Sequence, residues 1–96
     1  MAKVFRTASA KSDVAAIADF IAADNPPAAE RWLDEIDQTL MLIASHPQIG
    51  ERVDHLAPGI RRHSFGRYLL FYRVVDAGIE LRRVIHGARK IEDISL

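Results

Sequence analysis

Apolar residues recur at helical spacing in the first half of the chain and form continuous runs in the second half. The first stripe comprises Val14, Ile17, Ala18 and Ile21. Positions three and four apart share one face of a helix, so the stripe predicts an amphipathic helix over about residues 11–23. A first strand is expected over residues 3–9, and Ser9, at its end, is expected to cap the helix.

A second apolar stripe predicts a longer helix. It comprises Ala29, Trp32, Leu33, Ile36, Leu40, Ile43 and Ala44. Asn25 precedes two prolines, and because proline is tolerated in a first helical turn, the helix is expected to begin there with Asn25 as its cap. Pro47 ends it, with His46 at the helix end. The short link between the helices predicts an antiparallel helical hairpin.

Three strands are expected after a loop over residues 48–59, at residues 60–65, 67–75 and 79–86. The last two are joined by a three-residue loop, with Gly78 in a left-handed conformation. If Val75 pairs with Ile79, Leu69 lies opposite Ile85. The same register places Phe71 opposite Arg83 and Arg73 opposite Leu81.

These elements predict a single α+β domain over residues 1–96 with the order β-α-α-β-β-β. The helical hairpin packs on one face of a mainly antiparallel four-stranded sheet. Its two long strands are apolar on both faces, and strands of this kind are normally covered on both sides. One face holds Tyr68, Leu70, Tyr72, Val74, Arg82, Val84 and His86. Two helices cover one face only, so a partner from outside the chain is expected on the other. The alternatives are a second copy of the chain or an error in the assumed register.

Composition narrows the class of protein. The chain has no cysteine, which suits the cytoplasm, and no stretch approaches the length of a membrane span. Its histidines and acidic residues lack the spacing of a metal site. Residues 1–58 carry 5 basic and 9 acidic side chains, a charge of −4, whereas residues 59–96 carry 8 and 4, a charge of +4. This asymmetry fits either an anionic partner or basic strands that face the acidic helices of the same molecule.

Three segments, taken in order, carry a family resemblance: "HPQIG" after the long helix, "GRYLLFYRV", and "HGAR". With the two helices before them, they resemble the ParE branch of the ParE/RelE toxin superfamily over nearly the whole chain. The resemblance implies a small bacterial toxin that is not an enzyme, needs no cofactor and acts in the cytoplasm. Studied ParE proteins poison DNA gyrase, whereas RelE relatives cleave messenger RNA on the ribosome. That ribonuclease activity and a binding-only module that has lost toxicity are the alternatives.

The resemblance also implies partners. A ParD-like antitoxin would form a hetero-oligomer with at least two copies of each chain, and would make the only contact with DNA. Its C-terminal segment would lie on the open sheet face. The expected antitoxin-binding residues are Leu69, Phe71, Arg73, Arg83 and Ile85.

Target-binding and catalytic residues are expected among the basic side chains. The expected target-binding residues are Arg61, Arg62, Arg89 and Lys90. Cleavage of RNA needs a base, an acid and cations, for which Arg62, His86 and Arg89 are weak candidates. Leu69 stands where RelE-type nucleases have an arginine. Ser95 lies near the position at which those nucleases have a terminal aromatic residue. The resemblance therefore implies no catalysis.

Overall fold

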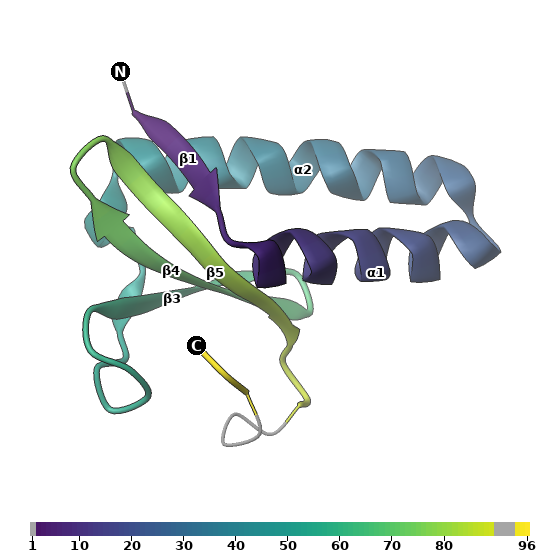
Figure 1. The fold of residues 1–96 in the computed structure, drawn as a ribbon. Helices are drawn as coiled ribbons and strands as arrows, with labels where there is room; N and C mark the ends of the chain where they lie inside the picture. Colours follow the sequence, from purple (N-terminus) through teal and green to yellow (C-terminus); the bar gives the residue numbers. More distant parts are fainter. Residues whose placement is uncertain (1, 90–93) are drawn as a thin grey trace.

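The protein is a helical hairpin packed on one face of a twisted sheet (Figure 1). The computed structural model describes residues 2–89 and 94–96. Its elements in chain order are β1 (Lys3–Arg6), α1 (Ala8–Asp24), α2 (Pro26–Ser45), the 3-10 turn η1 (Pro47–Ile49), β2 (Glu51–Arg52), β3 (Ile60–Phe65), β4 (Tyr68–Val75) and β5 (Gly78–His86). The two predicted helices and three main strands are therefore present.

The helix caps were predicted correctly for α2 and wrongly for α1. The side chain of Asn25 accepts a hydrogen bond from the Ala28 amide at 3.2 Å, as expected of a cap. For α1 the cap is Thr7 instead of Ser9, since its hydroxyl oxygen accepts from the Ala10 amide at 3.1 Å. The Thr7 hydroxyl also donates to the Arg82 carbonyl on β5 at 2.9 Å. A contact with a distant strand thus helps to fix where α1 begins.

Within residues 2–89 and 94–96 the sheet has five strands, in the order β1-β5-β4-β3-β2, not the predicted four. β1 runs parallel to β5, and the other neighbours are antiparallel. The additional strand is β2, in which Glu51 pairs with Arg62 and Arg52 with Arg61. Two residues are too short to produce an alternating pattern, so the sequence predicted only a loop there.

A β-bulge corrects the predicted pairing of β4 with β5. Val75 pairs with Gly78, so the connection has two residues instead of three, and Arg73 lies opposite Glu80 and not Leu81. The register shifts between Phe71 and Tyr72, after which the predicted pairs Phe71–Arg83 and Leu69–Ile85 are recovered. Arg82 is the additional residue of the bulge, because Tyr72 pairs with Leu81 and Phe71 with Arg83.

Gly78 is required where β1 pairs with the start of β5. Its φ is +153°, and a Cβ at this position would collide with the main-chain oxygen of Lys3. Lys3 and Gly78 are paired residues of the parallel ladder. A larger residue would therefore push β1 away from the sheet.

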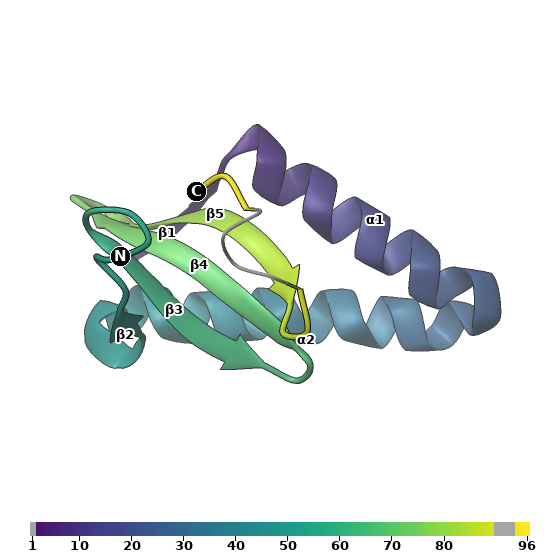
Figure 2. The same ribbon diagram turned by 90° about the horizontal axis from the view of Figure 1, so that it is seen from below.

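The main core lies between the hairpin and the sheet, with α2 running behind β3 and β4 when the sheet faces the viewer (Figure 2). Its fully buried residues include Ile36, Leu40 and Ile43 from α2, and Leu70, Tyr72, Ile79 and Leu81 from the sheet. The expected helix stripe is confirmed, although Trp32 and Leu33 are only partly buried at its edge.

Tyr72 is the one core side chain of this set with a polar end. Its hydroxyl donates to the Pro47 carbonyl at 2.7 Å and accepts from the Gly50 amide at 2.8 Å. A Cβ on Gly50 would overlap the Tyr72 ring, so the two residues fit closely. Burial raises the pKa of the Tyr72 phenol, and this effect outweighs the hydrogen bond donated by the Gly50 amide, which by itself lowers the pKa.

Candidate functional site

The face of the sheet turned away from α2, here called the second face, carries most of the expected binding residues. Strand register places Arg62, Phe71 and Arg83 in one row across β3, β4 and β5. Leu69 and Ile85 lie opposite each other on the same face.

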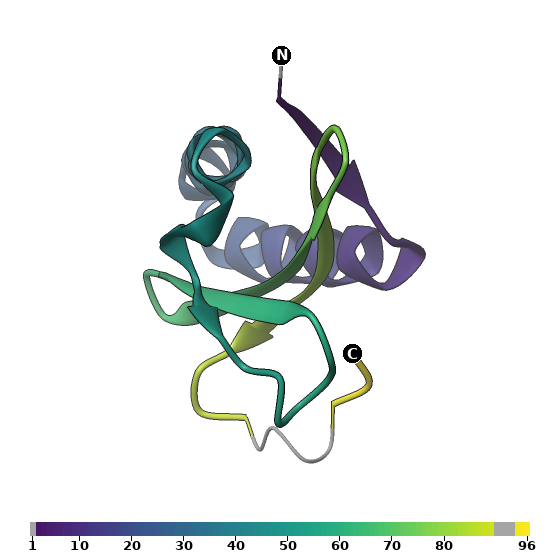
Figure 3. The same ribbon diagram turned by 90° about the vertical axis from the view of Figure 1, so that its left-hand side faces the viewer.

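The second face is covered by the chain itself, contrary to the expectation that a partner must cover it. Phe71 is completely buried and Ile85 is 2% exposed, in a cluster with Val53 and Ile60. The partly buried residues packed against this cluster are Leu56, Ala57, Leu69, Ile94 and Leu96. The loop before β3 and residues 94–96 lie on the side of the sheet opposite α2 (Figure 3). Leu69 is therefore half-buried, and Phe71 and Ile85 are core residues.

Arg83 is held at the edge of this cluster by α1. Its Nε donates to Asp13 Oδ2 at 2.7 Å and its Nη2 to Oδ1 at 3.2 Å, and both side chains are mostly buried. The same Asp13 carboxylate accepts from the Val84 amide at 3.0 Å. The hydrogen bonds that Arg83 donates to the Asp13 carboxylate raise the pKa of the Arg83 guanidinium. An external carboxylate that binds Arg83 must therefore share it with Asp13 or replace Asp13.

Arg82 does not share a face with Tyr72 and Val84, although the simple alternation placed the three together. The bulge lets its guanidinium reach Leu96, whose main-chain oxygen accepts from Nε at 3.1 Å and from Nη2 at 2.7 Å. Its Nη1 donates to Glu80 Oε1 at 2.9 Å. Arg83 Nη1 also donates to the Ser95 carbonyl at 3.1 Å. The two arginines together bind the main-chain oxygens of the consecutive residues Ser95 and Leu96.

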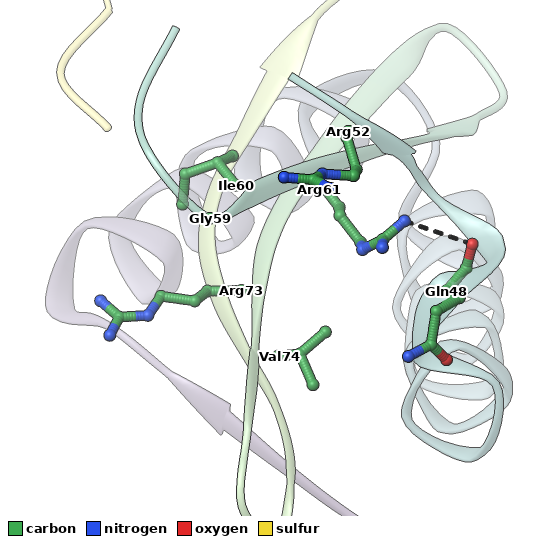
Figure 4. Close-up of a pocket in the computed structure, with 7 residues that line it drawn as sticks. All are labelled: Gln48, Arg52, Gly59, Ile60, Arg61, Arg73 and Val74. Atoms are coloured by element: carbon green, nitrogen blue, oxygen red, sulfur yellow. Dashed lines mark hydrogen bonds between the residues drawn. The ribbon is translucent and has the colours of Figure 1, made fainter. Parts of the chain in front are cut away.

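Arg73 is exposed and has no side-chain hydrogen bond to any other part of the chain that the structure describes. It borders a shallow hollow of about 340 Å³. The lining residues are Gln48, Arg52, Gly59, Ile60, Arg61, Arg73 and Val74. Figure 4 shows that Arg61 and Arg73 extend to opposite sides of this hollow. Arg61 donates to the carbonyls of Gly50 at 2.7 Å and Gln48 at 3.4 Å, while Arg73 remains free to meet a partner.

The expected catalytic candidates do not form one cluster. Arg62 lies on the second face and forms an ion pair with Glu51. His86 pairs with Tyr68, whose ring packs on Trp32 of α2, so the histidine belongs to the opposite face. His86 Nδ1 accepts from the Ala88 amide at 3.1 Å.

The expected target-binding residues are likewise separated. Arg61 pairs with Tyr72 near the start of β3, whereas Arg89 is exposed beyond the end of β5. Lys90 lies outside the described residues. Within residues 2–89 and 94–96 there is no group of three or more potential metal-binding side chains. Over the same ranges, no helix combines the length and apolar character needed to cross a membrane.

The sequence missed Asp13, Arg82 and residues 94–96 as parts of the site. Asp13 directly precedes the buried Val14, so a carboxylate next to the apolar stripe was the available signal. For residues 94–96 the signal was the alternation of Ile94, Ser95 and Leu96, which is too short to assign by itself.

Comparison with known proteins shows which family the chain resembles. The family model described as "ParE toxin of type II toxin-antitoxin system, parDE" matches residues 4–91. Toxin ParE1 of Mycobacterium tuberculosis, strain CDC 1551, is 41% identical over 65 residues, which cover 67% of this chain and 66% of that protein. Toxin ParE1 of Caulobacter vibrioides is 38% identical over 58 residues, or 60% and 59% of the two chains. The aligned stretches thus span slightly less than two thirds of these relatives.

A solved structure shares the fold. A chain from the chromosomal ParDE TA system of P. aeruginosa superposes with a TM-score of 0.74 at 20% identity, over 90% of this chain and 96% of that one. The overall fold is therefore shared with a chain from a ParDE system.

Proposed function

Because the chain belongs to the family of ParE toxins of type II toxin–antitoxin systems, we propose that it arrests bacterial growth until a ParD-like antitoxin neutralises it. The proposal is carried by the family match, which extends over all the helices and strands except the first residue of β1. The toxin would act in the cytoplasm, without a cofactor, and would contact DNA only through the antitoxin.

The proposed antitoxin site is the second face. Phe71 and Ile85 provide an apolar base for it, with Leu69 half-buried beside them. Arg73 and Arg83 would bind acidic side chains of the antitoxin at the edges, because a planar guanidinium pairs well with a carboxylate. The antitoxin would join two or more toxins in one hetero-oligomer.

The proposed target is DNA gyrase, and the proposed action is binding without catalysis. The separation of Arg62 and His86 onto opposite faces supports this, since general acid–base catalysis needs its groups within hydrogen-bond reach of one substrate. Arg61, Arg62, Arg89 and Lys90 are the proposed target contacts. Of these, Arg89 is exposed and is the clearest to test.

Expression of the chain without an antitoxin tests the function. We expect growth arrest with filamentation and a DNA-damage response, the result of gyrase trapped on cleaved DNA. Rapid arrest of translation with cuts in messenger RNA would replace this proposal with the RelE-type endonuclease. Growth without any effect would favour a binding-only module.

Two substitutions separate binding from catalysis in the same assay. We expect His86→Gln to keep toxicity and Arg89→Ala to reduce it, because a binding surface does not depend on proton transfer. Arg31→Ala, which removes an exposed arginine from α2, is the matched control for Arg89. Loss of toxicity in a folded His86→Gln variant would contradict the non-catalytic mechanism.

A further inference from the structure

Residues 94–96 lie on the second face as a short peptide would. Ile94 and Leu96 are partly buried and pack against the cluster that contains Phe71 and Ile85, whereas Ser95 between them is exposed. Side chains two positions apart that point to the same side are typical of an extended segment. The second face therefore contacts every other side chain of the segment, Ile94 and Leu96 but not Ser95.

Polar contacts fix the same three residues through their backbone. Arg83 Nη1 donates to the Ser95 carbonyl at 3.1 Å, and two nitrogens of the Arg82 guanidinium donate to the main-chain oxygen of Leu96 at 3.1 and 2.7 Å. The Ser95 oxygen is a peptide carbonyl, which every extended segment has, so this contact does not depend on which side chains the segment carries. Specificity would come from the apolar positions, as in other modes of extended-peptide recognition.

We infer that this surface is a binding site for an extended apolar-x-apolar peptide, and that residues 94–96 are its resident ligand in the free protein. The site consists of Leu69, Phe71, Arg82, Arg83 and Ile85. This part rests on the proposed function: an antitoxin segment that binds the second face must displace residues 94–96. The antitoxin segment must also carry the same apolar-x-apolar pattern. The two segments compete because both need the same side chains.

The effect of residues 94–96 on the affinity for a competing peptide can be estimated. A segment on a short tether is held at an effective concentration in about the millimolar range. For residues 94–96 to be docked, their intrinsic Kd must lie below that concentration. If they are docked for 90–99% of the time, their removal raises the affinity for a competing peptide about 10- to 100-fold.

The experiment uses the full chain and a peptide of residues 90–96, KIEDISL, as the probe. In the variant Ile94→Ser/Leu96→Ser, we expect the added peptide to shift the amide NMR signals of Leu69, Arg82, Arg83 and Ile85 at submillimolar concentration. The unmodified chain should need at least about 10-fold more peptide. A peptide with serine at both apolar positions should produce no shift.

Phe20→Ser is the matched control, because it removes the most exposed apolar side chain, 78% accessible, at the far end of α1. It should respond to the peptide like the unmodified chain. Equal responses of the double variant and the unmodified chain would overturn the inference, as would equal binding of the two peptides. If the double variant lost its dispersed spectrum, Leu96→Ser alone would be titrated and judged by the same criteria.

A second titration separates this inference from the proposed function. An antitoxin that binds and displaces the peptide supports both. An antitoxin that binds beside the retained peptide contradicts the competition and the proposed antitoxin face, although the peptide site remains. Absence of antitoxin binding to every variant contradicts the proposed function and the competition, while the shifts induced by KIEDISL still decide whether the peptide site exists.

Discussion

At the scale of single residues, two polar groups in apolar surroundings tie separate elements together. Tyr72 connects β4 to the turn η1 through Pro47 and Gly50, and Asp13 connects α1 to β5 through Arg83 and Val84. The alternation correctly grouped Tyr72 with Leu70 and Val84 on one face but could not identify the partner of the Tyr72 hydroxyl. Such partners come from tertiary contacts between residues far apart in the chain, 22 to 71 positions in these cases.

The Tyr72 hydroxyl can be tested by Tyr72→Phe. The variant leaves the Gly50 amide and the Pro47 carbonyl without their partner, so we expect a loss of roughly 1–3 kcal/mol in the free energy of unfolding. Chemical denaturation measures it. Tyr68→Phe, whose hydroxyl has no hydrogen-bond partner among the described residues, should cost much less; a similar cost would show that the hydroxyl contacts of Tyr72 are unimportant.

Tyr72→Phe should also change how the stability of the protein depends on pH. Because burial raises the folded-state pKa of Tyr72, the folded protein keeps the phenol proton above the unfolded value of about 10. Its contribution to stability is therefore fully present below that pH and declines as the pH rises further. We expect Tyr72→Phe to show a shallower alkaline loss of stability than Tyr68→Phe, and an identical profile would contradict the effect of burial.

The Asp13–Arg83 pair can be compared with a more exposed pair. Asp13→Asn leaves Arg83 without its charged partner in a mostly buried position, and we expect a cost of roughly 1.5–3 kcal/mol. Asp37→Asn removes the partner of Arg6, where the carboxylate side chain is 61% exposed, and should cost about 1 kcal/mol or less. Thermal or urea unfolding of the two variants distinguishes them, and equal costs would refute the importance of burial.

At the scale of elements, periodicity predicted the helices and the three long strands because each extends over six residues or more. It failed for β2, for the bulge at Arg82, and for the cover of the second face. A bulge changes the side of one residue without changing the composition of the strand. The covering loop and residues 94–96 contribute only isolated apolar side chains such as Val53 and Leu96, which no periodic pattern identifies.

The cover of the second face makes Phe71 a structural residue. We expect Phe71→Ala to reduce the free energy of unfolding by roughly 3–5 kcal/mol, because a fully buried aromatic ring leaves a cavity. Val74→Ala, on the same strand but 40% exposed, should cost less than about 1 kcal/mol. Calorimetry provides the comparison, and a stable Phe71→Ala variant would mean that the second face is open in solution.

At the scale of the whole molecule, the charges are separated in space as they are in sequence. The helical hairpin bears most of the acidic residues of the first half, and its far end projects beyond the sheet in Figures 1 and 2. The sheet bears most of the arginines of the second half. Net charge is zero, so attraction of an acidic partner depends on which side it approaches.

The direction of approach predicts different effects of equal charge changes. We expect Arg73→Glu to slow association with an acidic ParD-like antitoxin and to weaken its dependence on salt, because exposed charges at an interface mainly change the association rate. Arg31→Glu changes the net charge equally but lies on α2, and should have a smaller effect. Stopped-flow measurements at several salt concentrations test this, and equal slowing would indicate that only net charge matters.

The parallel pairing of β1 with β5 also determines when the fold can be completed during synthesis. Thr7 and Arg82, which join the end of β1 to β5, are 75 positions apart, so the first strand has no partner until the last one emerges from the ribosome. At about 5–20 residues per second, the 41 positions from Ser45 to His86 take about 2–8 seconds, during which the helical hairpin exists without the strand that completes the sheet. A nascent chain therefore cannot present the finished second face, and an antitoxin specific for that face would recognise the toxin only after β5 has been synthesised and paired with β1.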